Sequence, residues 1–258
     1  MKNQPYNVEE PKINVGTAGW GLPRATWPHF LSGSSHLERY SSRFNAVEIN
    51  SSFYRPHRRA TYEKWAASVP TGFCFSVKLP KAFTHELRLD VSGSEAKGAL
   101  QSFFEQVSGL KEKFCCLLIQ LPPSLPYSPA KAMQFFKLLR DQYQGVVAVE
   151  PRNFSWFGNE AEVLFRQEEL SRVLADPVLF DAGRWPGGDP RAVYLRLHGS
   201  PRIYYSAYGR TLIQSLATRM RMASHTASTV WCVFDNTASG AATADALYLN
   251  ELLKPAYR

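Results

Sequence analysis

Six charged residues at the ends of short apolar runs have the types that proton transfer on an anion needs. In chain order they are Glu48, Lys78, Glu150, Asp176, Arg196 and His198. An imidazole or carboxyl group whose pKa lies near the working pH transfers protons well, so His198 and Glu150 are the candidate general acid and base. Cations stabilise developing negative charge, and carboxylates orient such cations. We therefore interpret Glu48, Lys78, Glu150, Asp176 and His198 as the candidate catalytic residues of an enzyme, with Arg196 as a residue that binds its substrate.

Within this set, Lys78 and Arg196 would hold the anion together with Arg152, while Glu48 and Asp176 would orient the cations. Lys78 also admits a second interpretation, because burial can lower the pKa of a lysine far enough for imine formation. Neighbouring carboxylates act in the opposite direction and favour the charged amine. Anion holding is therefore the expected role of Lys78.

Residues that follow the same apolar runs offer groups for substrate binding. Gly16–Trp20 predicts a tight turn whose backbone N–H groups could approach an anion. Aromatic rings could flank a planar or sugar-like ligand, although packing on the core is the commoner use of a single aromatic residue. Loops after the last two strands of a barrel often hold phosphate. The predicted binding residues are Trp20, Asn50, Tyr54, His85, Gln120, Arg152, Trp156, Arg196, Gly199, Tyr208, Arg210 and Asn236.

Eight short β-rich runs would position these residues, at 13–18, 46–50, 73–78, 115–121, 146–150, 172–176, 193–198 and 230–236. Between several of them, apolar residues recur at helical spacing, over 94–110, 129–143, 212–222 and 241–253. Strands that alternate with helices predict parallel βαβ units, and eight units in this length fit one closed (β/α)8 TIM-like barrel. The barrel domain is expected over residues 13–254, after an N-terminal extension over 1–12. The Pro- and Gly-rich segment 177–192 predicts an irregular unit.

Alternation along each run predicts which side chains face the barrel interior. In the run 193–198 the apolar face must pack on the helices, so Arg196 and His198 point inward. Alternation along the other runs predicts seven more inward-facing side chains: Glu48, Asn50, Lys78, Gln120, Glu150, Asp176 and Asn236. Buried charges are costly unless paired, and barrel enzymes keep their chemistry at the carboxyl ends of the strands. We therefore expect a ring of mixed charge there, for which a purely structural ion-pair network is the alternative.

The composition is that of a globular protein, with 45% hydrophobic and 13% aromatic residues among 258. A net charge of +8 suits a solvated cationic surface, an anionic substrate or nucleic acid. No run approaches the roughly 18–20 apolar residues of a membrane span. The start of the chain lacks the apolar segment of a signal peptide. We expect a cytoplasmic protein without membrane contact, and a monomer.

Four cysteines lie in apolar runs, none with the spacing of a metal site: Cys74, Cys115, Cys116 and Cys232. Adjacent Cys115 and Cys116 would face opposite sides of a strand. Buried free cysteine is common in reducing compartments, so the sequence predicts four reduced core thiols.

Three functions remain open. The first is an isomerase, lyase or hydrolase of a small phosphorylated or sugar-like anion. The second is a nucleic-acid-binding or nuclease-like barrel with a basic rim, and the third is a ligand-binding module without catalysis. No cofactor is predicted; a single Mg²⁺ or Mn²⁺ would fit Glu48, Glu150 or Asp176, whereas multinuclear zinc is disfavoured by the cations beside these carboxylates. Nucleophile-elbow, P-loop and dinucleotide motifs are absent from the sequence.

A series of short motifs resembles the YecE-like family, catalogued as domain of unknown function family 72. The motifs are Gly16–Trp20, 48–50 with 52–54, 75–78 with His85, 120–123, 150–152 with 155–156, 196–199 and 234–236. They follow the family order and run from about residue 13 to the last helix. The resemblance implies a TIM-barrel-like fold and supplies no activity, because the family has none established. Where many members carry two asparagines after the last strand, this chain has Asp235-Asn236.

Overall fold

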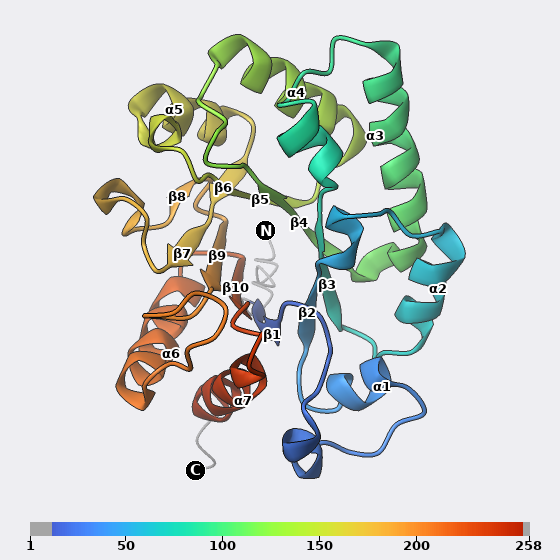
Figure 1. The fold of residues 1–258 in the computed structure, drawn as a ribbon, viewed down its shortest axis with the longest axis vertical. Helices are drawn as coiled ribbons and strands as arrows, with labels where there is room; N and C mark the ends of the chain where they lie inside the picture. Colours follow the sequence, from blue (N-terminus) through green and yellow to red (C-terminus); the bar gives the residue numbers. More distant parts are fainter. Residues whose placement is uncertain (1–11, 255–258) are drawn as a thin grey trace, which may run out of the picture.

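Parallel strands alternate with helices in the computed structural model, which describes residues 12–254 (Figure 1). One sheet has four strands in the order β1 (Lys12–Thr17), β10 (Thr229–Phe234), β9 (Ala192–Leu197) and β7 (Leu174–Asp176). The other has six, in the order β2 (Ala46–Ile49), β3 (Cys74–Lys78), β4 (Phe114–Gln120), β5 (Val146–Glu150), β6 (Leu170–Arg172) and β8 (Gly187–Gly188). Every pair is parallel except β6 with β8. Seven of the eight predicted strands and the parallel α/β class are confirmed, whereas the predicted strand 172–176 is divided between β6 and β7, which belong to different sheets.

Helices surround the strands on the outside (Figure 1). They are α1 (His36–Ser41), α2 (Arg59–Ala67), α3 (Ser94–Val107), α4 (Pro129–Gln142), α5 (Asn159–Gln167), α6 (Arg210–Ser224) and α7 (Ala241–Leu253). The four helices predicted from apolar spacing are all present, and Pro129 opens α4, where its missing N–H costs nothing. Segment 177–192 holds only a short 3₁₀ turn at Asp181–Gly183 and β8, as predicted. None of the helices within residues 12–254 combines the length and the apolar character needed to span a bilayer.

The two sheets meet at two places. Val173 separates β6 from β7 and donates its N–H to the Val149 carbonyl at 2.8 Å. On the other side, a single parallel bridge joins Ala18 to Glu48. There a Cβ at Gly16 would lie 2.1 Å from the Ala46 carbonyl oxygen, so only glycine lets β1 approach β2 this closely. The structure therefore has one α/β domain with two parallel sheets. Closure of the strands into a continuous hydrogen-bonded barrel is not confirmed.

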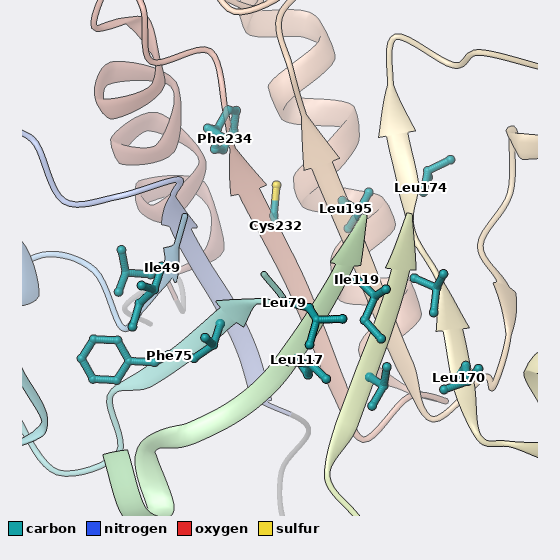
Figure 2. Close-up of a cluster of buried hydrophobic side chains, with 14 of the residues drawn as sticks. Ile49, Phe75, Leu79, Leu117, Ile119, Leu170, Leu174, Leu195, Cys232 and Phe234 are labelled. Carbon is teal, nitrogen blue, oxygen red and sulfur yellow. The ribbon is translucent and has the colours of Figure 1, made fainter. Parts of the chain in front are cut away.

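Side chains alternate between two hydrophobic cores. The outer core packs between the strands and the helices, and Figure 2 shows its members Ile49, Phe75 and Leu195 on three different strands. The inner core fills the space between the sheets with Ala46, Cys74, Cys116, Leu118, Ala148, Val173, Tyr194, Trp231 and Val233. Since Val47, Val77, Val147 and Val149 also belong to the outer core, the orientation predicted for β2, β3 and β5 is confirmed. Alternation then turns Glu48, Lys78 and Glu150 toward the interior.

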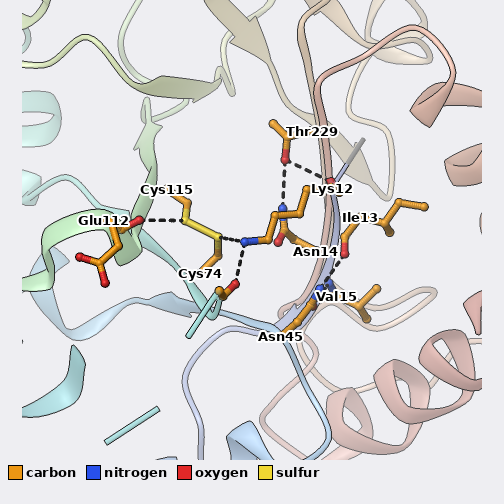
Figure 3. Close-up of a disulfide and its surroundings, with 10 residues drawn as sticks. Lys12, Ile13, Asn14, Val15, Asn45, Cys74, Glu112, Cys115 and Thr229 are labelled. Carbon is orange, nitrogen blue, oxygen red and sulfur yellow. Dashed lines mark hydrogen bonds between the residues drawn. A yellow bond between two sulfur atoms is a disulfide. The ribbon is translucent and has the colours of Figure 1, made fainter. Parts of the chain in front are cut away.

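One of the cysteine predictions is wrong. Cys74 and Cys115 form a disulfide with their Cα atoms 5.5 Å apart (Figure 3), whereas Cys116 and Cys232 are free and buried as predicted. Cys115 is the extra residue where the register between β3 and β4 shifts, so it and Cys116 both pack against the inner core instead of facing opposite ways. The four-thiol argument for a reducing compartment therefore loses its basis. The predicted extension over residues 1–12 lies outside the described residues except for Lys12.

Candidate functional site

Seven charged side chains gather where the parallel strands end, and we call them the carboxyl-end cluster. They are Glu48, Lys78, Glu150, Arg152, Arg196, His198 and Asp235. Six of them are linked by salt bridges, and Lys78 interacts with the others through its charge. Six of them belong to the residues predicted from sequence. Asp235 was not predicted.

Arg196, on β9, is the centre of the cluster and binds three carboxylates. Its Nη2 lies 2.7 Å from Glu48 Oε1 and 3.1 Å from Asp235 Oδ2, and its Nη1 lies 2.9 Å from Glu150 Oε2. Burial acts to lower the pKa of Arg196, but the charges of Glu48, Asp235 and Glu150 hold it well above its usual value. Burial likewise acts to raise the pKa of Glu150, and the Arg196 charge is the foremost of the effects that bring it well below normal. Arg196 and Glu150 therefore stabilise each other's charged forms.

Tyr194 closes the network at its deepest point. The Tyr194 hydroxyl lies 2.9 Å from Glu48 Oε2 and 2.9 Å from Ser76 Oγ, and Ser76 is the register partner of Glu48 on the neighbouring strand β3. Both Glu48 and Tyr194 are fully buried. Because the guanidinium and this hydroxyl satisfy the Glu48 carboxylate, Glu48 serves to orient Arg196 and is shielded from solvent.

His198 lies between two carboxylates. Its Nδ1 is 2.9 Å from Asp235 Oδ2 and its Nε2 is 2.9 Å from Glu150 Oε1. A neutral imidazole has one N–H, so only the protonated ring can donate to both oxygens. Burial acts to lower the pKa of His198, but the Glu150 charge and the hydrogen bonds to Asp235 and Glu150 raise it overall. His198 is thus held as an imidazolium with two acceptors in place.

This arrangement predicts how stability depends on pH. Since folding raises the pKa of His198, its contribution to stability is complete below the unfolded value of about 6.5 and disappears as pH rises through the folded value. Folding lowers the pKa of Glu150 and Asp235, so their contribution is lost on the acid side instead. We expect wild type to lose more unfolding free energy than His198→Gln between pH 6 and pH 9, in urea titrations. The exposed His225→Gln variant should keep the wild-type slope; equal slopes for wild type and His198→Gln would contradict the assignment.

Arg152 and Lys78 form the outer part of the cluster. Arg152 Nε and Nη2 contact Glu150 Oε1 at 3.2 and 3.1 Å, and its Nη2 lies 3.5 Å from His198 Nε2. The Arg152 side chain is 20% exposed, against 1% for Arg196, so Arg152 is the more accessible guanidinium. Lys78 Nζ lies 4.2 Å from the centre of the Phe53 ring. These two cations are the ones that an incoming anion would meet first.

Two further residues border the outer cluster without having been predicted. Tyr204 lies with its ring edge-on to His198, at 6.0 Å between ring centres, and within interaction range of Arg152. Phe53 packs against Lys78 on one side and against His85 at 5.1 Å on another. Both lie in the loops that follow strands, Phe53 after β2 and Tyr204 after β9, and this position is the sequence signal that could have indicated them.

A cavity of about 740 Å³ lies next to the ends of β1, β2 and β10, and its lining residues include no member of the carboxyl-end cluster. Trp20, Asn50 and Thr237 are among the lining residues, so two predicted binding residues border it. Asn50 Oδ1 is buried and has no hydrogen-bond partner within residues 12–254. The cavity and the cluster follow the same strand β2, since Asn50 comes two residues after Glu48.

The backbone N–H groups of the Gly16–Trp20 turn are already used. Thr17 donates to the Tyr40 hydroxyl, Ala18 to the Phe234 carbonyl and Gly19 to Glu48. The predicted anion cradle in this turn is therefore wrong, because these donors join neighbouring strands.

The predicted inward position of Asp176 is wrong. Asp176 pairs in register with Leu197 of the outer core, so it points away from the interior. Its carboxylate instead accepts from the Tyr208 hydroxyl at 2.9 Å. That hydroxyl in turn accepts the Gly199 N–H at 2.7 Å, so Gly199 and Tyr208 fix a loop and present no donor to a ligand.

Asn236 is also placed wrongly by the alternation argument. Trp231 and Val233 are inner-core residues, which turns Asp235 inward and Asn236 outward. Asn236 Nδ2 donates to Asp245 Oδ2 at 2.8 Å, at α7, and to the Ser206 carbonyl.

The remaining predicted binding residues are distributed as follows. Trp156 is 1% exposed and packs in the outer core, so its predicted position beside a ligand is wrong. Tyr54 is 75% exposed and packs edge-on against Phe53. Arg210 begins α6 and stacks over Tyr248, away from the cluster. Gln120 pairs in register with Glu150 and borders the cluster.

No group of three or more His, Cys, Asp or Glu within residues 12–254 has the arrangement of a metal site. Glu48 and Glu150 already share Arg196 as their counter-ion, and Asp176 points elsewhere. The three carboxylates predicted as candidate ligands for one divalent ion therefore do not converge.

Known sequences place the chain in a family. The model of "Protein of unknown function DUF72" matches residues 14–258. UPF0759 protein YunF of Bacillus subtilis (strain 168) is 26% identical over 167 residues, which cover 64% of this chain and 57% of YunF. UPF0759 protein YecE of Escherichia coli (strain K12) is 26% identical over 161 residues, covering 60% of this chain and 58% of YecE. The matches thus span about three fifths of the curated relatives.

Solved structures agree. A DUF72 family protein from Thermotoga maritima MSB8 superposes with a TM-score of 0.77 at 25% identity, covering 94% of this chain and 99% of the other. A DUF72 family protein from Enterococcus faecalis V583 has a TM-score of 0.76 at 19% identity, covering 95% and 97%, and this similarity shows the fold alone. The resemblance predicted from the short motifs is confirmed, and the chain belongs to DUF72, a family of proteins of unknown function.

Proposed function

We propose that the carboxyl-end cluster binds a small anionic substrate and transfers protons on it. The observation that carries this proposal is the charge balance of a nearly buried site. With His198 protonated, four cationic side chains face three carboxylates, which leaves one positive charge uncompensated. A positive charge removed from water is costly unless an anion accompanies it. One bound anion would restore neutrality.

The substrate anion would contact Arg152 and Lys78. Arg152 is the more exposed guanidinium, and it contacts Glu150 through Nε and Nη2. A guanidinium can bind a carboxylate or phosphate through two N–H groups. Arg196, by contrast, is fully engaged by its three carboxylates and would act by holding Glu150 and Asp235 in place.

His198 would carry the proton. As an imidazolium between Glu150 and Asp235 it has a proton to donate, and the two carboxylates keep its ring oriented in either protonation state. Glu150 is the candidate acceptor, because it hydrogen-bonds His198 and reaches Arg152. This chemistry suits isomerisation, elimination or hydrolysis equally.

The rest of the substrate would lie in the neighbouring cavity. Its volume of about 740 Å³ is within the usual range for a small-molecule site. Asn50 lines it, and a small rotation of its side chain would let the unpartnered Oδ1 accept from a hydroxyl or amide of the substrate. A site at the carboxyl ends of parallel strands surrounded by helices is the arrangement of (β/α)8 enzymes, and we regard the two sheets as an open form of that barrel.

The proposal is tested by calorimetric titration and thermal shift with inorganic phosphate, glycerol 3-phosphate and a short single-stranded DNA. We expect a small phosphate to bind wild type and Arg152→Met to weaken it about 10- to 100-fold, the loss of one charge-assisted contact. Arg210→Met, which removes a surface cation from another helix, should bind like wild type. Binding of DNA alone, or equal binding by wild type and Arg152→Met, would overturn the proposal.

A further inference from the structure

The Lys78 amine lies against an aromatic ring, although the residues around it are charged. Its side chain ends β3 and is only 8% exposed. The Nζ lies 4.2 Å from the centre of the Phe53 ring, while the Lys78 carbonyl accepts the buried Ser52 hydroxyl at 2.6 Å. The strand end and the turn that carries Phe53 are thereby fixed to each other. The amine is held in one place by packing and not by a salt bridge.

Lys78 forms no ion pair and donates no hydrogen bond to any residue between 12 and 254. The carboxylates that could have paired with it are taken by other cations: Glu48 and Glu150 by Arg196, and Asp235 by Arg196 and His198. In a structural ion-pair network each buried cation would be expected to have its own partner. The amine therefore remains available to a ligand.

Charges on every neighbouring element act on this amine. Burial lowers the pKa of Lys78 most, followed by the charge of Arg196, and the carboxylates of Glu48, Glu150 and Asp235 raise it less, so that it falls to about 8. His85 and Arg152 also lie within electrostatic range of the same site. About one amine in ten is then unprotonated at pH 7, against about one in three thousand for an ordinary lysine. Most of the Lys78 amine therefore stays charged at pH 7, as the neighbouring carboxylates lead one to expect, and burial makes the remaining part available as the free amine.

A histidine lies within electrostatic range of the amine. The His85 ring packs against another side of the Phe53 ring, and its Nδ1 is 2.8 Å from Thr84 Oγ1. Burial, then the charges of Lys78 and Arg152, lower the pKa of His85, which favours its neutral imidazole. It would take up a proton from the Lys78 ammonium through a bridging water, while His198 remains a proton donor in the same cluster.

We propose that Lys78 is a nucleophile that forms an imine with the carbonyl group of a small anionic aldehyde or ketone. This inference rests on the proposed function and makes it more specific, because it names a carbonyl compound as the substrate class. Arg152 would hold the anionic group while the carbonyl carbon meets Nζ. A buried, unpaired lysine among acid/base groups is the arrangement that imine chemistry requires.

The step balances without a further reactant. The Lys78 ammonium gives one proton to His85, and the amine lone pair forms a bond to the carbonyl carbon. The carbonyl oxygen takes a proton from His198, which gives a carbinolamine. The carbinolamine nitrogen next gives a proton back to His198, which frees its lone pair. The hydroxyl then leaves as water with the proton returned by His85, while that lone pair forms the carbon–nitrogen double bond. The products are a protonated imine and one water, and both histidines regain their starting protonation.

Trapping by reduction tests the proposal. Wild type is incubated at pH 7 with glyoxylate or pyridoxal phosphate and sodium cyanoborohydride, which reduces an imine to a stable secondary amine. Intact mass and peptide mapping then locate the adduct. We expect one adduct on Lys78, formed on the order of 100-fold faster than on Lys81, in line with the larger fraction of free amine. Lys81 is a matched control because it lies on the surface and pairs with Glu86.

Variants separate the inference from the proposed function. Lys78→Arg keeps the charge and should abolish the adduct, whereas Lys81→Arg should leave it unchanged; thermal unfolding confirms that each is folded. If glyoxylate protects wild type against heat but no adduct forms on Lys78, the imine is overturned and the anion site stands. If neither probe binds or reacts, both proposals fail. Labelling of Lys78 and Lys81 at equal rates would also overturn the inference.

Discussion

Replacing Arg196 with methionine should lower the free energy of unfolding by about 3–5 kcal/mol, the usual cost of removing one partner from a buried ion pair. The side chain is 1% exposed and is the shared counter-ion of Glu48, Glu150 and Asp235. Methionine fills a similar volume, so the loss measures uncompensated charge more than a cavity. Urea unfolding followed by circular dichroism gives the difference directly.

Two controls make this measurement specific to the network. Arg191→Met removes an exposed arginine that pairs with Glu169 and Asp189, and should change stability by less than about 1 kcal/mol. The double variant Arg196→Met with Glu48→Gln should be more stable than Arg196→Met alone, because the amide removes one unpaired buried charge. If the double variant is the less stable, Glu48 and Arg196 do not act as a pair.

Sequence periodicity predicted the strands well where one face was distinctly polar. In β9, Tyr194, Arg196 and His198 alternate with apolar residues, so the face toward the interior was unambiguous. In β2 and β5 the faces that carry Glu48 and Glu150 were equally easy to tell from the apolar faces. Each of these residues lies where the alternation argument placed it, because a one-residue shift would have buried a charge against the helices.

The failures occur where alternation carries no information. In β10 every residue from Val230 to Phe234 is apolar and buried on both faces, so the sequence does not say whether Asp235 or Asn236 turns inward. At Asp176 the outward face is covered by the irregular segment 177–192 and by Tyr208, which supplies a polar partner that no helix pattern indicates. At Cys115 a β-bulge changes the count by one residue, and a bulge leaves no mark in apolar periodicity.

The sequence predicted most of the charged residues that gather at the carboxyl ends of the strands, but it did not predict which of them pair with each other. Sequence indicated that Lys78 and Arg196 share a site with carboxylates, and it assigned both to anion holding. Only the three-dimensional arrangement shows that Arg196 takes all three carboxylates and leaves Lys78 against Phe53. Competition between two cations for the same oxygens depends on distances of a few ångströms, which residue types do not encode.

Replacing Trp156 with alanine is the second substitution with a large expected effect on stability. Its aromatic ring was predicted from sequence to contact a ligand, but it lies in the outer core. In the structure the ring is 1% exposed, packs at 6.0 Å from Phe165 and at 4.9 Å from Tyr127, and donates its Nε1–H to the Leu125 carbonyl at 2.9 Å. Trp156→Ala should therefore lower the free energy of unfolding by about 3–5 kcal/mol, as for other large core aromatics. Urea titration of the purified variant measures it.

The matched control is Trp185→Ala, which removes the same side chain from a position that is 69% exposed and should change stability by no more than about 0.5 kcal/mol. Phosphate binding to folded Trp156→Ala distinguishes a core role from contact with the ligand. If the ring only supports the loop after β5, the affinity should change far less than in Arg152→Met, because Arg152 reaches the cluster through contacts of its own. A variant that keeps wild-type stability but loses phosphate binding would place Trp156 at the ligand after all, and the outer core would then have to close without it.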